Sequence, residues 1–211
     1  MKHPAKFSDP ILVVVESLLP AAGRLLDPFA GTGKVHRLAT PTLWTVGVEL
    51  EPEWATMHPQ TVVGNALRLP FADGTFDVIV TSPTYGNRMA DHHEAKDTSR
   101  RMTYRHTLGR PLHPANSGAM QWGKEYRRFH EQAWAEAVRV LRPGGRFILN
   151  CSDHIRRGDP QPVTAWHVAT LVASGLEVMD QVAVPTQRMR CGQNGTSRVD
   201  HEWVVALERT I

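Results

Sequence analysis

The chain has 211 residues, a length typical of one domain that buries its own hydrophobic core. Apolar residues make up 41% and charged residues 21%, which excludes a disordered chain, and no apolar run is long enough to span a membrane. The formal charge is only +3, and a pI of about 9.1 allows a nucleic-acid partner without requiring one. We expect a cytoplasmic protein, because residues 1–4 do not lead into a signal-peptide core.

Strand and helix patterns alternate along the chain. Helices are predicted, in chain order, at residues 9–19, 34–39, 52–57, 124–141 and 162–173. Strands are predicted at residues 24–27, 44–49, 61–63, 76–81, 146–151, 176–184 and 201–208. Asp9-Pro10 is typical of an N-cap followed by a proline in the first helical turn. Pro143-Gly144-Gly145 is expected to end the long fourth helix.

Strands separated by helices favour an α/β fold with a doubly wound, mostly parallel sheet of seven strands and helices on both faces. The last two strands leave no room for a helix between them, so we expect a hairpin with one antiparallel strand. Residues 1–211 are predicted to form a single domain. Residues 87–123 follow neither pattern, and a loop of that length inside a domain is typically functional or disordered.

A glycine-rich turn follows the first predicted strand, in the run DPFAGTG from Asp27 to Gly33. Gly31 and Gly33 let a ligand approach the backbone closely. Glu49 ends the next strand, 18 residues after Gly31, where an acid can accept hydrogen bonds from a ribose. The phosphate-binding GxGxxG and P-loop patterns are absent. We therefore predict a pocket for a nucleoside without phosphates; the alternative is a plain strand-to-helix turn.

The run DPFAGTG resembles the S-adenosylmethionine-binding motif of the amino-methyltransferases, which methylate exocyclic amines of nucleic-acid bases. The segment HPAKF (residues 3–7) is similar to the one that precedes this motif in many members. VLRPGGRF (residues 140–147) resembles a helix-to-strand turn of the wider Rossmann-like class I methyltransferase fold. The family often has Gly-Asp-Ala where this chain has Gly-Asn-Ala at 64–66. The resemblance implies S-adenosyl-L-methionine as cofactor, held by Lys6, Asp27, Pro28, Phe29, Gly31, Gly33, Glu49, Asn65 and Ala66.

TSPTYG (residues 81–86) ends the fourth strand and resembles the family's catalytic (Asp/Asn/Ser)-Pro-Pro-(Tyr/Phe) motif. An exocyclic amine is a poor nucleophile, because its lone pair is delocalised into the ring. Acceptors placed on its N–H groups favour the transition state, and Ser82 Oγ and the Pro83 carbonyl are the expected acceptors. Tyr85 is expected to stack on a base turned out of the helix. Thr84 replaces the family's second proline, which puts the rigidity of the turn in question.

The segment after this motif is basic, because residues 87–130 contain nine Lys and Arg but only four Asp and Glu. Aromatic residues interleaved with basic ones suit phosphates and stacked bases, although a solvated loop is the alternative. Residues 186–200 form a second arginine-containing loop at the same rim of the predicted sheet. The predicted nucleic-acid contacts are Arg88, Arg100, Arg101, Arg105, Arg110, Arg188 and Arg190.

The leading hypothesis is a site-specific DNA methyltransferase, with cytosine N4 favoured over adenine N6 because the motif begins with serine. An RNA base amino-methyltransferase and a non-catalytic nucleic-acid-binding module with this fold are the alternatives. The sequence leaves a monomer and a homodimer equally open. No bound metal is expected, since the histidines of the insert and the two cysteines, Cys151 and Cys191, lack zinc-site spacing.

Overall fold

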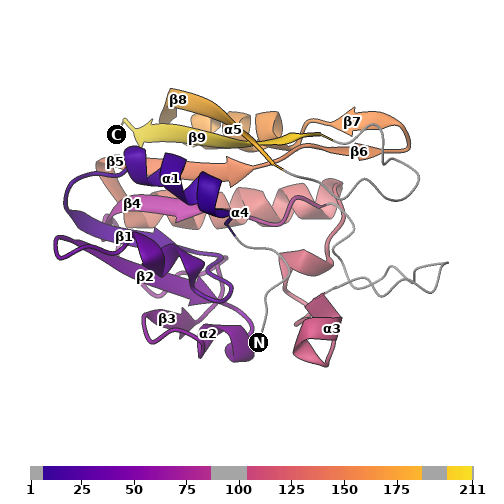
Figure 1. The fold of residues 1–211 in the computed structure, drawn as a ribbon, viewed down its shortest axis with the longest axis horizontal. Helices are drawn as coiled ribbons and strands as arrows, with labels where there is room; N and C mark the ends of the chain where they lie inside the picture. Colours follow the sequence, from indigo (N-terminus) through magenta and orange to yellow (C-terminus); the bar gives the residue numbers. More distant parts are fainter. Residues whose placement is uncertain (1–6, 87–103, 187–198, 211) are drawn as a thin grey trace.

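The protein is described by a computed structural model over residues 7–86, 104–186 and 199–210, with only the backbone of residues 105 and 106. A seven-stranded sheet, in the order β3-β2-β1-β4-β5-β9-β8, forms its centre (Figure 1). Neighbouring strands are parallel except at β9, which is antiparallel to both β5 and β8. This confirms the expected sheet with one antiparallel strand. The strands are β1 (Gly23–Asp27), β2 (Leu43–Glu49), β3 (Thr61–Val63), β4 (Phe76–Thr81), β5 (Leu141–Cys151), β8 (Leu176–Pro185) and β9 (His201–Arg209).

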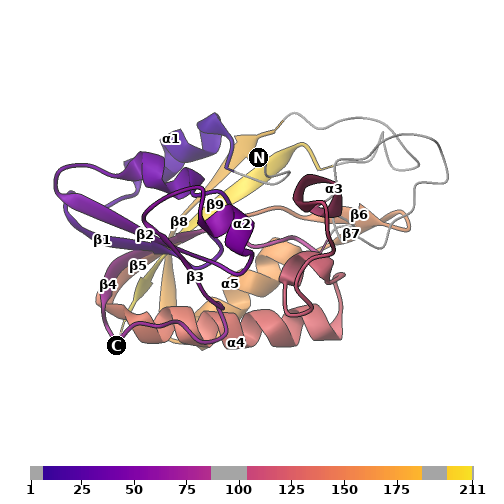
Figure 2. The same ribbon diagram turned by 90° about the horizontal axis from the view of Figure 1, so that it is seen from below.

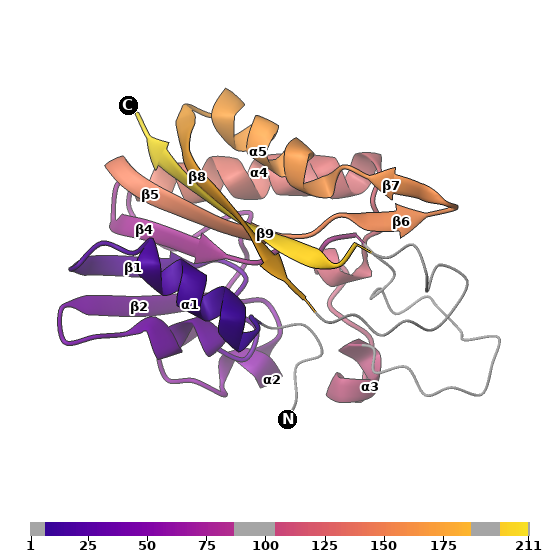
Figure 3. The ribbon, with the colours of Figure 1, turned by 45° about the horizontal axis from the view of Figure 1, so that its top comes forward.

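Helices cover both faces of the sheet, with α1 on one face and α4 and α5 on the other (Figures 2 and 3). The alternation of side chains along β4 divides the core accordingly. Val78 and Val80 belong to the cluster that contains Ile11 of α1, whereas Ile79 belongs to the one that contains Trp134 of α4. The helices are α1 (Asp9–Ser17), the 3-10 helix η1 (Lys34–Leu38), α2 (Pro52–Ala55), α3 (Tyr104–Leu108), the 3-10 helix η2 (Ser117–Ala119), α4 (Lys124–Val140) and α5 (Val163–Ala173).

The first helix differs from its prediction in its N-cap, and it ends at Ser17 instead of 19. Ser8 is the N-cap, and Asp9 is the first helical residue. The Asp9 carboxylate does not cap the helix, because it binds Lys34 Nζ and an Arg37 guanidinium nitrogen, each at 2.8 Å. It thereby connects α1 to η1, which is a 3-10 helix where an α-helix start was expected.

The join between α4 and β5 also differs from its prediction. The helix ends at Val140 and the strand begins at once with Leu141, five residues before the predicted start at 146. Leu141 pairs with Phe76 and Arg146 pairs with Val78, so the residues between them form an irregular start of the strand. Pro143-Gly144-Gly145 therefore lies inside β5, and the helix has ended before it.

A short antiparallel hairpin was not predicted. Its strands β6 (His154–Arg156) and β7 (Asp159–Gln161) are joined at Arg157 and Gly158, both with positive φ (55° and 89°). Two consecutive residues with positive φ are typical of a tight hairpin turn. Pro160 within the second strand hid this pattern, since proline counts against a strand.

The second half of the insert is folded. Within residues 104–123, α3 and η2 lie beyond the carboxyl ends of the strands (Figure 1). Tyr104 of α3 packs edge-on against Trp54 of α2, with ring centroids 5.6 Å apart, and Leu112 completes this small core. Across the described residues, no helix has the length and apolar character to cross a bilayer.

Candidate active site

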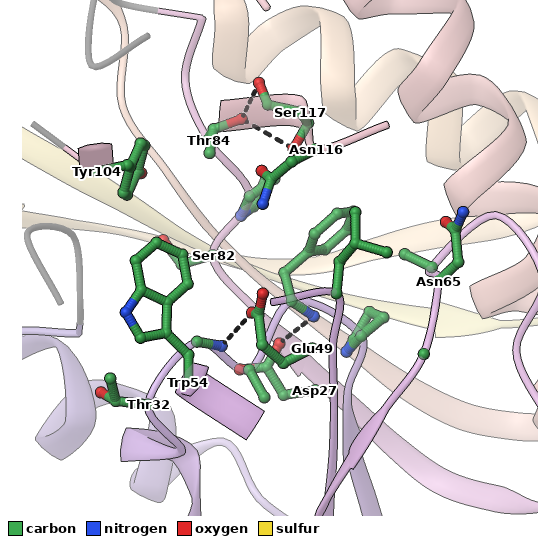
Figure 4. Close-up of a pocket in the computed structure, with 18 of the residues that line it drawn as sticks. Asp27, Thr32, Glu49, Trp54, Asn65, Ser82, Thr84, Tyr104, Asn116 and Ser117 are labelled. Atoms are coloured by element: carbon green, nitrogen blue, oxygen red, sulfur yellow. Dashed lines mark hydrogen bonds between the residues drawn. The ribbon is translucent and has the colours of Figure 1, made fainter. Parts of the chain in front are cut away.

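A cavity of about 330 Å³ lies at the carboxyl ends of β1, β2 and β4, where ligands bind in open α/β sheets (Figure 4). Its walls come from the glycine-rich turn, the end of β2, the turn after β4 and the folded half of the insert. Two motifs far apart in the sequence therefore share one cavity. The lining includes Phe7, Asp27, Pro28, Phe29, Gly31, Glu49, Trp54, Asn65, Ala66, Ser82, Pro83, Tyr85, Tyr104, Asn116 and Glu202.

Glu49 stands at the end of β2 with its side chain toward the glycine-rich turn (Figure 4). Its Oε2 accepts from the Gly31 N–H at 2.8 Å and its Oε1 from the Glu51 N–H at 2.9 Å. Burial raises the pKa of this carboxyl from 4.5 to about 7. A carboxylate offers about four acceptor positions, so Glu49 keeps capacity to accept from a ligand in the cavity.

Asp27 joins the ends of β1 and β4. Its Oδ1 accepts from the Phe29 N–H at 3.0 Å and from the Thr81 hydroxyl at 2.9 Å. Burial, assisted by the charge of Glu49, raises the pKa of this carboxyl to about 7. Asp27 therefore shapes the turn as well as lining the cavity.

The other predicted cofactor residues divide into lining and shaping groups. Gly31 and Gly33 both have the left-handed backbone that favours glycine, with φ of 53° and 77°. Gly33 does not line the cavity, and a Cβ there would lie 2.8 Å from the side chains of His36 and His58. Asn65 lines the cavity, and its Oδ1 accepts from the Leu67 N–H at 2.9 Å.

The remaining members of that set are Pro28, Phe29, Ala66 and Lys6. Pro28 and Ala66 are buried lining residues, and the Phe29 ring packs edge-on against Trp134, with centroids 5.9 Å apart. Lys6 lies outside the described residues.

Hydrogen bonds hold the Ser82–Tyr85 turn at Thr84, where the motif that it resembles has a second proline. The Thr84 Oγ1 lies 3.2 Å from the Ser117 carbonyl oxygen and 3.1 Å from the Ser117 hydroxyl (Figure 4). The Thr84 carbonyl accepts from the Tyr126 hydroxyl of α4. Gly86, with φ of 64°, accepts from the Trp122 N–H at 3.0 Å. The insert and α4 thus supply the restraint that the proline ring would have given.

A buried chain of hydrogen bonds supports this turn from behind. Trp134 Nε1–H donates to His167 Nδ1 at 2.9 Å, which leaves the ring proton of His167 on Nε2. Nε2 lies 2.9 Å from the Tyr126 hydroxyl, which therefore accepts from His167 and donates to the Thr84 carbonyl. Burial lowers the pKa of His167 well below 6.5, in keeping with this neutral form.

A second chain connects the predicted catalytic residues to β9. Ser82 Oγ lies 3.0 Å from Tyr85 Oη, and the Tyr85 hydroxyl donates to Glu202 Oε2 at 3.0 Å. Burial and the charge of Glu202 raise the pKa of Tyr85 well above 10, so its hydroxyl keeps its proton. Sequence reasoning missed Glu202, because a single acid on a strand carries no local signal.

A buried acid fastens the insert to the cavity. Glu51 is fully buried, and its Oε1 accepts from the His113 N–H and from Asn116 Nδ2, each at 2.8 Å. Its Oε2 lies 2.7 Å from an Arg110 nitrogen, and Arg110 also forms a two-point contact with Glu53. Arg110 therefore fastens the insert to the end of β2 and α2, and its nucleic-acid role stays a prediction.

Of the seven predicted nucleic-acid contacts, only Arg110 has a described side chain. Arg88, Arg100, Arg101, Arg188 and Arg190 lie outside the described residues, as does Cys191. Arg105 lies in α3, but only its backbone is described. Among the described residues, no group of three or more His, Cys, Asp or Glu side chains could hold a metal ion. Cys151 is buried, and burial raises the pKa of its thiol well above the usual value.

Comparison with known proteins identifies the fold. No family model and no curated protein matches the sequence. A solved S-adenosylmethionine-dependent methyltransferase from Methanosarcina mazei has a TM-score of 0.61 and 13% identity, over 94% of this chain and 97% of that one. The fold is that of the class I methyltransferases.

Two further structures show how widely the class I methyltransferase fold is used. A possible histamine N-methyltransferase from Thermotoga maritima has a TM-score of 0.55 and 18% identity, over 94% of this chain and 87% of that one. The [4+2]-cyclase SpnF has a TM-score of 0.58 and 16% identity, over 96% and 80%. The reaction must therefore be argued from the residues of the site, since the fold serves more than one chemistry.

Proposed function

We propose that this protein transfers a methyl group from S-adenosyl-L-methionine to an exocyclic amine of a nucleic-acid base, with cytosine N4 in DNA as the preferred target. One observation carries the proposal. The Gly31–Glu49 pair and the Ser82–Tyr85 turn line the same cavity, so a nucleoside cofactor and a planar amine can meet there.

The residues present fit the cofactor. Glu49 keeps capacity to accept from the hydroxyls of a ribose, while Asn65 and Ala66 line the wall of the cavity proposed to hold adenine. The Gly31 backbone allows close approach. When bound, S-adenosyl-L-methionine supplies an electrophilic methyl group.

The residues of the turn fit the acceptor amine. Ser82 Oγ and the Pro83 carbonyl accept the two N–H groups, which increases the tetrahedral character of the nitrogen and makes its lone pair available. The Tyr85 ring lines the same cavity and holds the base plane by stacking. Positioning of the two reactants supplies much of the rate, and no covalent enzyme intermediate is needed.

Methyl transfer from labelled S-adenosyl-L-methionine tests the proposal directly. Duplex DNA, single-stranded DNA and RNA are offered separately, and the products are digested to nucleosides. N4-methylcytosine from DNA is the expected product. Label confined to RNA would favour the RNA base enzyme instead, and binding without transfer to any polymer would favour the non-catalytic module.

DNA as the partner rests on the basic insert and has its own test. Arg100, Arg101 and Arg105 changed together to Glu should abolish binding of a labelled duplex and leave cofactor affinity intact. The wild-type affinity should fall steeply with salt, because each phosphate contact releases counterions. Unchanged affinity and an unchanged salt slope in the triple variant would refute a role for these arginines.

A further inference from the structure

We propose that Glu202 is a positioning residue for the transfer, because it sets the direction of the hydrogen bonds that run from Ser82 through Tyr85 to β9. This inference rests on the proposed function, in which Ser82 Oγ accepts an N–H of the amine. A serine hydroxyl can donate or accept, so its usefulness as an acceptor depends on where its own proton points.

The direction of these hydrogen bonds can be followed from Asn150 of β5. Its amide nitrogen lies 3.3 Å from the Trp203 carbonyl oxygen, which can only accept, so the nitrogen of the amide is identified. The same nitrogen donates to Glu202 Oε2 at 3.1 Å. Glu202 Oε2 is therefore an acceptor already held in place by a buried side chain.

The Tyr85 hydroxyl meets this oxygen at 3.0 Å. An ionised carboxylate only accepts, so the single phenolic proton of Tyr85 goes to Glu202. Asn150 Oδ1 lies 3.4 Å from the same hydroxyl, and it too can only accept the Tyr85 proton. The Tyr85 oxygen therefore has no proton to donate to Ser82 and can only accept from it.

Ser82 must therefore donate across the 3.0 Å contact with Tyr85. Its proton points away from the amine, and both lone pairs of Oγ stay available to accept. Among the described residues, no other hydrogen bond is made by Ser82 Oγ. Glu202 thus gives the serine the acceptor character that an aspartate at this motif position would have without assistance.

A double-mutant cycle tests whether Glu202 acts through the Tyr85 hydroxyl. Tyr85→Phe keeps the stacking ring and removes only the hydroxyl. Glu202→Leu removes the nearer, charged acceptor and leaves only Asn150 Oδ1 at 3.4 Å. Each should lower kcat at saturating cofactor about tenfold, the size of one well-placed hydrogen bond. The double variant should be no slower than either single variant. Glu202→Gln, which keeps an acceptor oxygen, should recover part of the rate, while cofactor affinity stays constant throughout.

Two controls separate positioning from a loss of structure. Glu208→Leu, at the far end of the same strand, should leave kcat unchanged. The same cycle is measured by urea unfolding, in which Tyr85→Phe and Glu202→Leu should also be non-additive if the hydrogen bond exists. If Glu202→Leu does not fold, Glu202→Ala replaces it in both cycles.

The outcomes are distinct. The inference would be overturned if the two tenfold losses of kcat multiplied to about a hundredfold in the double variant. It would also be overturned if the two changes in the free energy of unfolding simply added. A kcat insensitive to Glu202 with a coupled unfolding cycle would reduce Glu202 to a structural residue. Failure of the wild-type protein to methylate any base amine would refute the proposed function and the catalytic part of this inference, while the unfolding cycle would still report the hydrogen-bond chain.

Discussion

Tyr126→Phe should destabilise the protein far more than the loss of one oxygen atom suggests. Tyr126 is fully buried, and its hydroxyl accepts from His167 Nε2–H and donates to the Thr84 carbonyl. Phenylalanine keeps the ring but leaves both partners unpaired in the core. Each unpaired buried group costs about 1–3 kcal/mol, so the two together should lower the free energy of unfolding by about 2–4 kcal/mol after partial relaxation.

Urea unfolding followed by fluorescence measures this loss. In a His167→Leu background, Tyr126→Phe should cost clearly less, because the imidazole N–H that it would leave unpaired is already absent. Turnover should also fall in the single variant, since the Thr84 carbonyl loses the donor that holds the Ser82–Tyr85 turn. A change in unfolding free energy below about 0.5 kcal/mol would refute the hydrogen-bond chain as a support of the turn.

Four other substitutions, at three positions, probe the cavity and the contacts that hold its walls in place. Glu49→Ala should weaken binding of S-adenosyl-L-methionine and of its demethylated product in calorimetry, and unchanged affinity in a folded variant would remove Glu49 from the site. Because the pKa of Glu49 is raised to about 7, the folded state keeps this proton between pH 4.5 and about 7, whereas the unfolded state has lost it. The free energy of unfolding of the wild type, compared with that of Glu49→Gln, should therefore be greatest below pH 4.5 and decline as the pH rises to 7. Glu51→Ala should lower the free energy of unfolding by about 1–3 kcal/mol and speed proteolysis of residues 110–117, because the His113 N–H and the Asn116 amide lose their buried acceptor. Gly86→Ala should cost more than about 1 kcal/mol, because its Cβ would lie 2.6 Å from the Trp122 nitrogen at a positive φ, and an unfolding midpoint like that of wild type would contradict this contact.

The regular elements could be predicted because their signals are local. The strands Thr61–Val63 and Phe76–Thr81 have the predicted bounds, since β-branched runs are bounded by turn residues on both sides. The helix Lys124–Val140 ends within one residue of its prediction, because its buried residues recur at helical spacing. The start of β5 was predicted five residues too late, because Pro143-Gly144-Gly145 was interpreted as the end of the helix. The helix ends before this run, since Leu141 already pairs with Phe76 as part of the strand.

The contacts that complete the site depend on residues far apart in the chain. Glu51 and Arg110 are 59 positions apart, and Tyr85 and Glu202 are 117 apart, so no spacing rule connects them. Glu51 follows a strand in a polar stretch of the sequence, and no local pattern marks it as buried. Its burial appears only when the insert folds back over the end of β2, and this step requires the tertiary structure.

The replacement of the second motif proline by Thr84 changes what the geometry of the turn depends on. A proline restricts the backbone through its own ring, wherever its neighbours lie. A threonine restricts it only while its partners stay in place, and here these partners are Ser117 of the insert and Tyr126 of α4. The position of Ser82 is therefore coupled to the insert as well as to its own strand. Since the same insert is proposed to hold the nucleic acid, the segment proposed to bind the substrate also holds the turn proposed to act on it.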